Sequence, residues 1–143
     1  MFDEVDFVRE SNRIEGIYRE PTDEEMTEFF RFMDLGRVHI FDLEHFVNVY
    51  QPGACLRNRL GRDVRVGGHV PPLGGPGIEQ SIAAILADIK RNTAYEIHMR
   101  FETLHPFTDG NGRCGRMLWM SQMREAPLGF LHTFYYQALQ GGR

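Results

Sequence analysis

Residues 105–116, HPFTDGNGRCGR, concentrate the polar groups of this chain that could do chemistry. Gly110 and Gly112 permit unusual backbone angles just before a predicted helix, and the backbone amides at a helix start bind anions. Arg113 and Arg116 are three residues apart on that helix, so both guanidinium groups can reach one side of a bound anion. Two arginines beside a helix start predict a ligand with more than one phosphate, as in a nucleotide.

Two further residues of this stretch add metal binding and proton transfer. The carboxylate of Asp109 is suited to a Mg²⁺ ion that also binds the phosphates. His105 directly precedes the loop, and an imidazole is the natural general base near neutral pH. The stretch therefore predicts a nucleotide site beside a nucleophile that awaits deprotonation.

Three other interpretations of these residues are weaker. Three of the glycines have the spacing of a dinucleotide-binding fingerprint, but a predicted helix precedes them where that fingerprint needs a strand. A Walker loop needs a Gly-Lys pair, and Lys90, which is the only lysine, has no glycine beside it. A metal cluster of His98, His105 and Asp109 matches no common ligand spacing. His98 is better explained as a packed helix residue.

The elements that must position this stretch are predicted to be helices. Apolar spacing and capping signals predict an all-α domain, with a cap at Thr22, a cap at Asp42 and a helix end before Pro106. Residues 64–70 alternate around a Gly-Gly pair, which is typical of a short β-hairpin. Helices are expected over residues 3–16, 22–35, 42–50, 78–89, 93–104, from 111 onward and, as a last short one, over 130–139.

Composition narrows the class of protein further. The chain has 143 residues, of which 42% are hydrophobic and 25% charged, so one packed domain is expected. A net charge of −4 counts against nucleic acid or an anionic membrane as a direct partner. The charge is uneven, because residues 1–28 hold ten acidic and three basic residues. An acidic N-terminus and the lack of a long apolar run make the cytoplasm the expected compartment.

The sequence of residues 105–116 resembles the motif of the Fic family, HPFx(D/E)GNGRxxR, with every defining position filled. The resemblance extends to the two flanking helices, to the hairpin region and to the N-terminal segment. It implies a single Fic domain over residues 1–143, built from about six to eight helices with one short β-hairpin flap at about 57–72.

The usual reaction of this family transfers AMP from ATP to a protein hydroxyl and releases pyrophosphate. The resemblance implies that His105 would deprotonate a Ser, Thr or Tyr hydroxyl of the target protein, and that Asp109 would hold the Mg²⁺ that accompanies ATP. It implies an anion hole at the helix start, with arginines on the β- and γ-phosphates; these nucleotide-binding positions are Gly110, Asn111, Gly112, Arg113 and Arg116.

A second motif lies in the acidic N-terminal segment. Residues 11–16, SNRIEG, resemble the inhibitory motif of the family, (S/T)xxxE(G/N), with Ser11, Glu15 and Gly16 at its fixed positions. The resemblance implies that Glu15 pairs with Arg116 and prevents the γ-phosphate from seating, while Ser11 supports the helix. Without the companion motif, the same residues would simply be a helix that ends at Gly16 with a solvated glutamate.

The hairpin region resembles the flap that holds an extended segment of the target protein by strand addition. The flap positions are Val64, Val66, Gly67, Gly68 and His69. The alternatives to AMP transfer are transfer of another phosphate-containing group, removal of AMP from a modified protein, and a regulatory module that binds nucleotide without catalysis. A homo-oligomer is left open.

Overall fold

The computed structural model describes residues 3–125, so the helix expected at 130–139 lies outside the described residues. Within this part, the chain forms an all-α fold of six α-helices and one 3-10 turn, as the sequence predicted. The elements are α1 (Glu4–Ile14), α2 (Asp23–Met33), α3 (Ile40–Tyr50), α4 (Gly77–Ala87), η1 (Ile89–Arg91), α5 (Ala94–Leu104) and α6 (Asn111–Met123).

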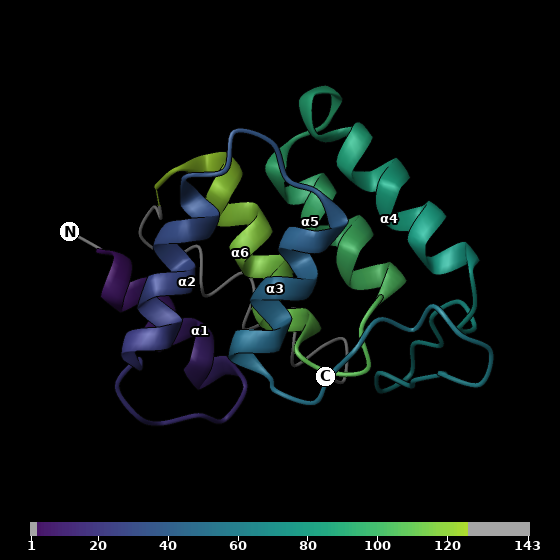
Figure 1. The fold of residues 1–143 in the computed structure, drawn as a ribbon, viewed down its shortest axis with the longest axis horizontal. Coiled ribbons are helices and arrows are strands. Elements are labelled where there is room, and N and C mark those ends of the chain that lie inside the picture. The colour runs from purple at the N-terminus through teal and green to yellow at the C-terminus, as the bar shows by residue number, and fades with distance from the viewer. Residues whose placement is uncertain (1–2, 126–143) are drawn as a thin grey trace.

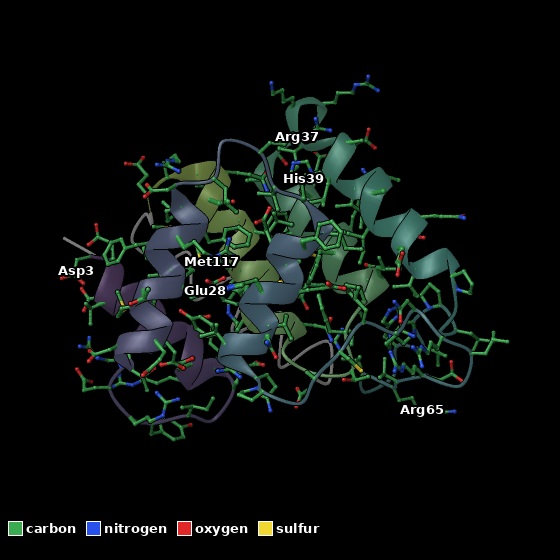
Figure 2. All side chains as sticks on the ribbon, viewed as in Figure 1. Asp3, Glu28, Arg37, His39, Arg65 and Met117 are labelled. Carbon is green, nitrogen blue, oxygen red and sulfur yellow. The ribbon has the colours of Figure 1, made fainter. Side chains whose placement is uncertain are left out.

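Helix α6 lies in the middle of the bundle. It contacts α5 most extensively and also packs against α1, α2 and α3 (Figure 1). Its residues from 111 to 120 are all buried, including Met117 in the interior (Figure 2). A central helix that is buried on nearly every side holds its N-terminal residues in a fixed place, and those residues belong to the predicted nucleotide site.

The first two helices each begin at a capping residue, of which Thr22 was predicted and Asp3 was not. The Asp3 carboxylate accepts a hydrogen bond from the Asp6 N–H, and the Thr22 hydroxyl accepts one from the Glu25 N–H. Helix α1 ends at Ile14, and the next glycine, Gly16, has a φ of +80°, which suits a residue without a side chain. The predicted stop signal and the cap at Thr22 are confirmed.

The predicted cap of the third helix was wrong. Helix α3 begins at Ile40, two residues before Asp42, and His39 occupies the N-cap position. The Asp42 carboxylate accepts a hydrogen bond from the His39 N–H at 2.9 Å, so it acts from the third helical position. An acidic residue can satisfy helix-start amides from either position, and sequence alone does not distinguish the two.

The expected hairpin is reduced to a single antiparallel bridge between Val66 and His69. These two residues exchange backbone hydrogen bonds of 3.1 and 2.9 Å around the Gly67-Gly68 turn. Residues 3–125 contain isolated bridges but no extended β-strand. A second isolated bridge joins Leu56 to Phe107. None of the helices in the described part is both long and apolar enough to cross a membrane.

Candidate functional site

The loop between α5 and α6 has an unusual backbone at both of its ends. His105 follows α5 directly and has a φ of +50°, the left-handed region that few residues other than glycine adopt, and Pro106 prevents the helix from continuing. Gly110 at the other end has a φ of +79°, and a Cβ there would lie only 3.1 Å from the Cβ of Gln51. Helix α6 begins immediately afterwards.

Three sets of contacts hold this loop in place. The Asn111 side chain accepts a hydrogen bond from the Phe107 N–H and donates one to the Phe107 carbonyl, both at 2.8 Å. Phe107 is itself buried in the core. Cys55 and Thr108 exchange two more hydrogen bonds, of 2.9 and 3.0 Å. The Asn111 side chain therefore locks the loop from the start of α6.

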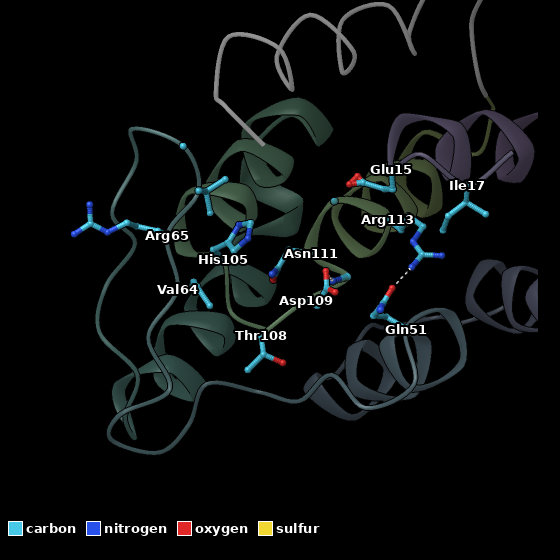
Figure 3. Close-up of a pocket in the computed structure, with 14 residues that line it drawn as sticks. Glu15, Ile17, Gln51, Val64, Arg65, His105, Thr108, Asp109, Asn111 and Arg113 are labelled. Carbon is cyan, nitrogen blue, oxygen red and sulfur yellow. Dashed lines mark hydrogen bonds between the residues drawn. The ribbon is translucent and has the colours of Figure 1, made fainter.

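A pocket of about 680 Å³ opens over the loop (Figure 3). Figure 3 shows His105 toward the flap side and Arg113 toward Gln51, with Asp109 and Asn111 between them. The pocket is also lined by Glu15 and by the flap residues at positions 64, 66 and 67. One cavity thus collects residues from the N-terminal helix region, the flap, the end of α3 and the start of α6.

The start of α6 presents backbone amides that could bind an anion at the pocket wall. The first helical hydrogen bond runs from the Cys114 N–H to the Gly110 carbonyl, so the amides of residues 111–113 precede the helical ladder at the pocket wall. One carboxylate oxygen of Asp109 accepts from the Gly110 N–H at 2.8 Å. The Asp109 side chain is exposed in the pocket, so its other oxygen can still bind a cation.

Arg113 is enclosed by polar groups from three helices. Its Nη2 donates to Gln51 Oε1 at 2.6 Å, and its Nη1 donates to Asn12 Oδ1 at 3.3 Å and lies 3.9 Å from a carboxylate oxygen of Glu25. The guanidinium also lies 5.6 Å from the centre of the Tyr50 ring. Burial lowers the pKa of Arg113 from its ordinary value, and nearby carboxylates oppose this shift.

Arg116 is fully buried beneath the end of α1 and does not line the pocket. Its Nε donates to Ser11 Oγ at 2.8 Å, and its Nη2 donates to the Ser11 carbonyl at 3.0 Å. The same Nη2 lies 3.5 Å from a carboxylate oxygen of Glu15. The N-terminal helix thus covers the second arginine of the motif with one hydroxyl, one carbonyl and one carboxylate.

Comparison with known proteins identifies the family. The family model described as Fic/DOC family matches residues 40–122, which is more than half of the chain. The chain belongs to the Fic/DOC family. It is also 33% identical over 106 residues to the proteins named Protein adenylyltransferase Fic of Drosophila persimilis and Drosophila pseudoobscura pseudoobscura, an alignment that covers 65% of this chain and 19% of each relative. No solved structure matches the chain.

The limits of the Fic match are informative. It includes the whole stretch from His105 to Arg116 but begins only at α3. Helix α1, with Ser11 and Glu15, lies before it. The contacts of Arg116 with Ser11 and Glu15 therefore involve residues outside the family match and are seen only in the structure of this chain.

The Fic motif residues and the flap do not all meet in the pocket. Gly68 and His69 lie outside its lining, and His69 Nε2 lies 2.8 Å from the carbonyl of Thr103. His98 is buried between helices, as expected of a packed residue. Gly16 adjoins the pocket residues Glu15 and Ile17 without lining the pocket itself.

Sequence reasoning missed three residues that shape the site, namely Asn12, Gln51 and Arg57. Asn12 occupies a variable position of the inhibitory motif, Gln51 directly follows α3, and Arg57 is buried in an irregular segment. Each of them contacts a residue that is far away in the sequence, and such a contact cannot be predicted from a local sequence pattern.

Proposed function

We propose that this chain transfers AMP from ATP to a Ser, Thr or Tyr hydroxyl of a target protein and that its own N-terminal helix restrains the reaction. The observation that carries the proposal is the single pocket in which His105, the start of α6, Arg113 and Asp109 lie together. The names of the Drosophila relatives support the same activity, although the chain spans only about a fifth of their length.

In this proposal His105 acts as the general base. Its imidazole takes the proton of the target hydroxyl, the oxygen attacks the α-phosphorus of ATP, and pyrophosphate leaves. The amides at the start of α6 and Arg113 stabilise the phosphate charge, with Arg116 available once its partners on α1 release it. The flap around Val66 holds the target segment beside His105.

The residues present fit a Mg²⁺ ion that arrives with ATP. Asp109 is exposed in the pocket, and one of its oxygens is not engaged by the Gly110 amide. No group of three or more metal-binding side chains occurs in residues 3–125. A single carboxylate suits Mg²⁺, which keeps several waters and takes its other ligands from phosphates. Bound there, the ion would neutralise phosphate charge.

The proposed restraint acts through Glu15 and Ser11. Both contact the Arg116 guanidinium, which a γ-phosphate would otherwise recruit. To lower activity 100-fold, the restrained state must be more stable than the active state by about 2.7 kcal/mol. One partly buried ion pair with two added hydrogen bonds is of that order.

A second candidate activity is the removal of AMP from a modified protein. The observation that favours it is the position of Glu15, whose carboxylate lines the same pocket as His105. A carboxylate there could orient a water molecule for attack on an AMP ester. Transfer of another phosphate-containing group is the remaining enzymatic alternative.

The test uses α-labelled and γ-labelled ATP with Mg²⁺ and a cell lysate. We expect Glu15→Gly to label proteins from the α-phosphate only, and the double variant Glu15→Gly/His105→Ala to label none while still binding ATP. Label from the γ-phosphate would indicate phosphorylation instead. Labelling that persists without His105 would refute the proposed base, and a lack of transfer with intact ATP binding would favour a regulatory module.

A further inference from the structure

Arg57, the first residue of the expected flap range 57–72, has a fully buried side chain that lies between the rest of the flap and the loop that carries His105. Arg57 belongs to the irregular segment between α3 and α4, and the Fic motif does not include it. Its backbone N–H donates to the Pro106 carbonyl at 2.9 Å, and its carbonyl accepts from the Gly75 N–H at 2.8 Å. Main-chain bonds thus fix the residue from both sides, and its side chain points into the junction.

One face of the Arg57 guanidinium closes the end of α5. Its Nε donates to the carbonyl of His105 at 2.7 Å, and its Nη2 donates to the carbonyl of Leu104 at 2.9 Å. Carbonyls at a helix C-terminus have no partner within the helix, and a positive charge there is favoured by the helix dipole. The bond to His105 holds the carbonyl of a residue whose φ of +50° is otherwise disfavoured.

The other face of the same guanidinium holds the flap. Its Nη1 donates to the carbonyl of Pro72 at 2.8 Å and to that of Arg62 at 3.2 Å. These two residues stand on either side of the Val66–His69 bridge, one before it and one after it along the chain. Four of the five N–H donors of the guanidinium are therefore used on four carbonyls from two segments.

The charge of Arg57 is balanced by carbonyl oxygens, because no carboxylate of residues 3–125 forms an ion pair with it. Burial lowers its pKa, and the more distant charge of Asp63 opposes this effect. An uncompensated buried charge is costly unless every donor is well placed. The planar guanidinium donates to four fixed carbonyls at once. A lysine has only three N–H donors, all on one nitrogen atom, so it cannot make the same set of bonds.

We infer that Arg57 is a positioning residue that sets the orientation of His105 and fixes the flap at a constant distance from it. This inference rests on the proposed function, in which His105 is the base and the flap holds the target. Arg57 itself does not line the pocket. It makes the base and the target-docking segment one rigid unit, so that a target hydroxyl held by the flap meets the imidazole in a reactive geometry.

The experiment compares Arg57→Lys and Arg57→Ala in the Glu15→Gly background, where transfer is measured as the initial rate of α-label incorporation. We expect Arg57→Lys to lower kcat by roughly 10- to 100-fold and to leave KM for ATP within about twofold, because misplacement of a catalytic group by about 1 Å has an effect of that size. Added guanidinium ion should restore part of kcat in Arg57→Ala but none in Glu15→Gly/His105→Ala.

Arg31→Lys provides the matched control for a general loss of stability. Arg31 also forms a fork, with Glu28 at 2.6 and 2.7 Å, but it lies on α2 and does not line the pocket. If kcat falls equally in Arg57→Lys and Arg31→Lys at equal loss of melting temperature, the inference is wrong. Unchanged kcat in Arg57→Lys would also overturn it, as would a fall in ATP affinity that accounts for the whole effect.

The proposed function and the role of Arg57 can fail separately. Loss of transfer in Glu15→Gly/His105→Ala, together with a kcat in Glu15→Gly/Arg57→Lys equal to that of Glu15→Gly, would keep the proposed function and remove the role of Arg57. Undiminished transfer in Glu15→Gly/His105→Ala would remove the proposed base whatever Arg57 does. Failure of Arg57→Ala to fold would leave the kcat of Arg57→Lys as the deciding measurement.

Discussion

Removal of the Glu15 carboxylate is the perturbation whose size follows most directly from the structure. Its Oε2 lies 3.5 Å from Arg116 Nη2, with 27% of the Glu15 side chain and none of the Arg116 side chain exposed. Opposite charges about 4 Å apart near a protein surface attract by about 4 kcal/mol before desolvation is subtracted. We take the net of roughly 1.5–3 kcal/mol that is typical of a hydrogen bond to a charged group as the upper range for this ion pair.

This net free energy sets the expected rise in activity. Each 1.4 kcal/mol corresponds to a factor of about ten, so Glu15→Gly should raise the rate of AMP transfer roughly 10- to 100-fold. The rise should stop short of full release, because the two hydrogen bonds from Arg116 to Ser11 remain in this variant. Adding Ser11→Ala should raise the rate again.

The assay measures incorporation of α-label at saturating Mg²⁺ over a range of ATP concentrations. Glu15 is the C-cap of α1, outside the helix proper, so glycine there should cost little helix stability. Glu15→Gln is the matched variant, since it keeps the shape of the side chain and removes its charge. Equal rates for the wild type, Glu15→Gly and Glu15→Gln, with His105 intact and the proteins folded, would refute autoinhibition by this ion pair.

Three further predictions concern stability and the metal. Gly115→Ala should lower the free energy of unfolding by about 1–3 kcal/mol in a urea titration, because a Cβ there would lie 2.5 Å from Glu102 Oε1. Burial raises the pKa of Glu25, but hydrogen bonds, first among them that from Arg19, outweigh this and hold the pKa below its usual 4.5. The Glu25 carboxylate therefore stabilises the fold above pH 4.5, and this stabilisation is lost as the pH falls through its folded pKa. Glu25→Gln should have a lower melting temperature than the wild type at pH 7, and the two melting temperatures should converge toward pH 3. Asp109→Asn should raise the Mg²⁺ concentration needed for half-maximal transfer by about tenfold or more.

The sequence predicted those parts of the fold that depend on local signals. The end of α1 before Gly16, the cap of α2, the end of α5 before Pro106 and the start of α6 follow from residue types within one helical turn of each boundary. Asp42 was misassigned because a helix-start acid has two equivalent local positions. The flap was expected as a hairpin and forms only the Val66–His69 bridge, because Pro71-Pro72 ends the pairing.

The candidate site was predictable only to the extent that it lies within one segment. The loop from His105 to Arg113 is continuous in sequence, and its polar residues indicate a nucleotide without any knowledge of the fold. Arg113 meets Asn12 across 101 positions and Gln51 across 62. Contacts over such distances are set by how helices pack, so local periodicity carries no information about them.

Helix α1 belongs to the core as well as to the site, and this limits how the proposed restraint can be relieved. Phe7 and Val8 are almost fully buried in the core cluster. Exposing either side chain to water would cost roughly 1.5–3 kcal/mol. The cost of exposing both exceeds the roughly 2.7 kcal/mol that a 100-fold restraint requires. Undocking the whole helix is therefore the more expensive way to free Arg116. Glu15 is at the exposed end of the helix, so a movement of that side chain alone breaks the ion pair. The two hydrogen bonds from Arg116 to Ser11 and the core contacts of α1 stay in place after such a movement. We therefore expect relief to act on residues 11–16 and the activated enzyme to keep α1 docked.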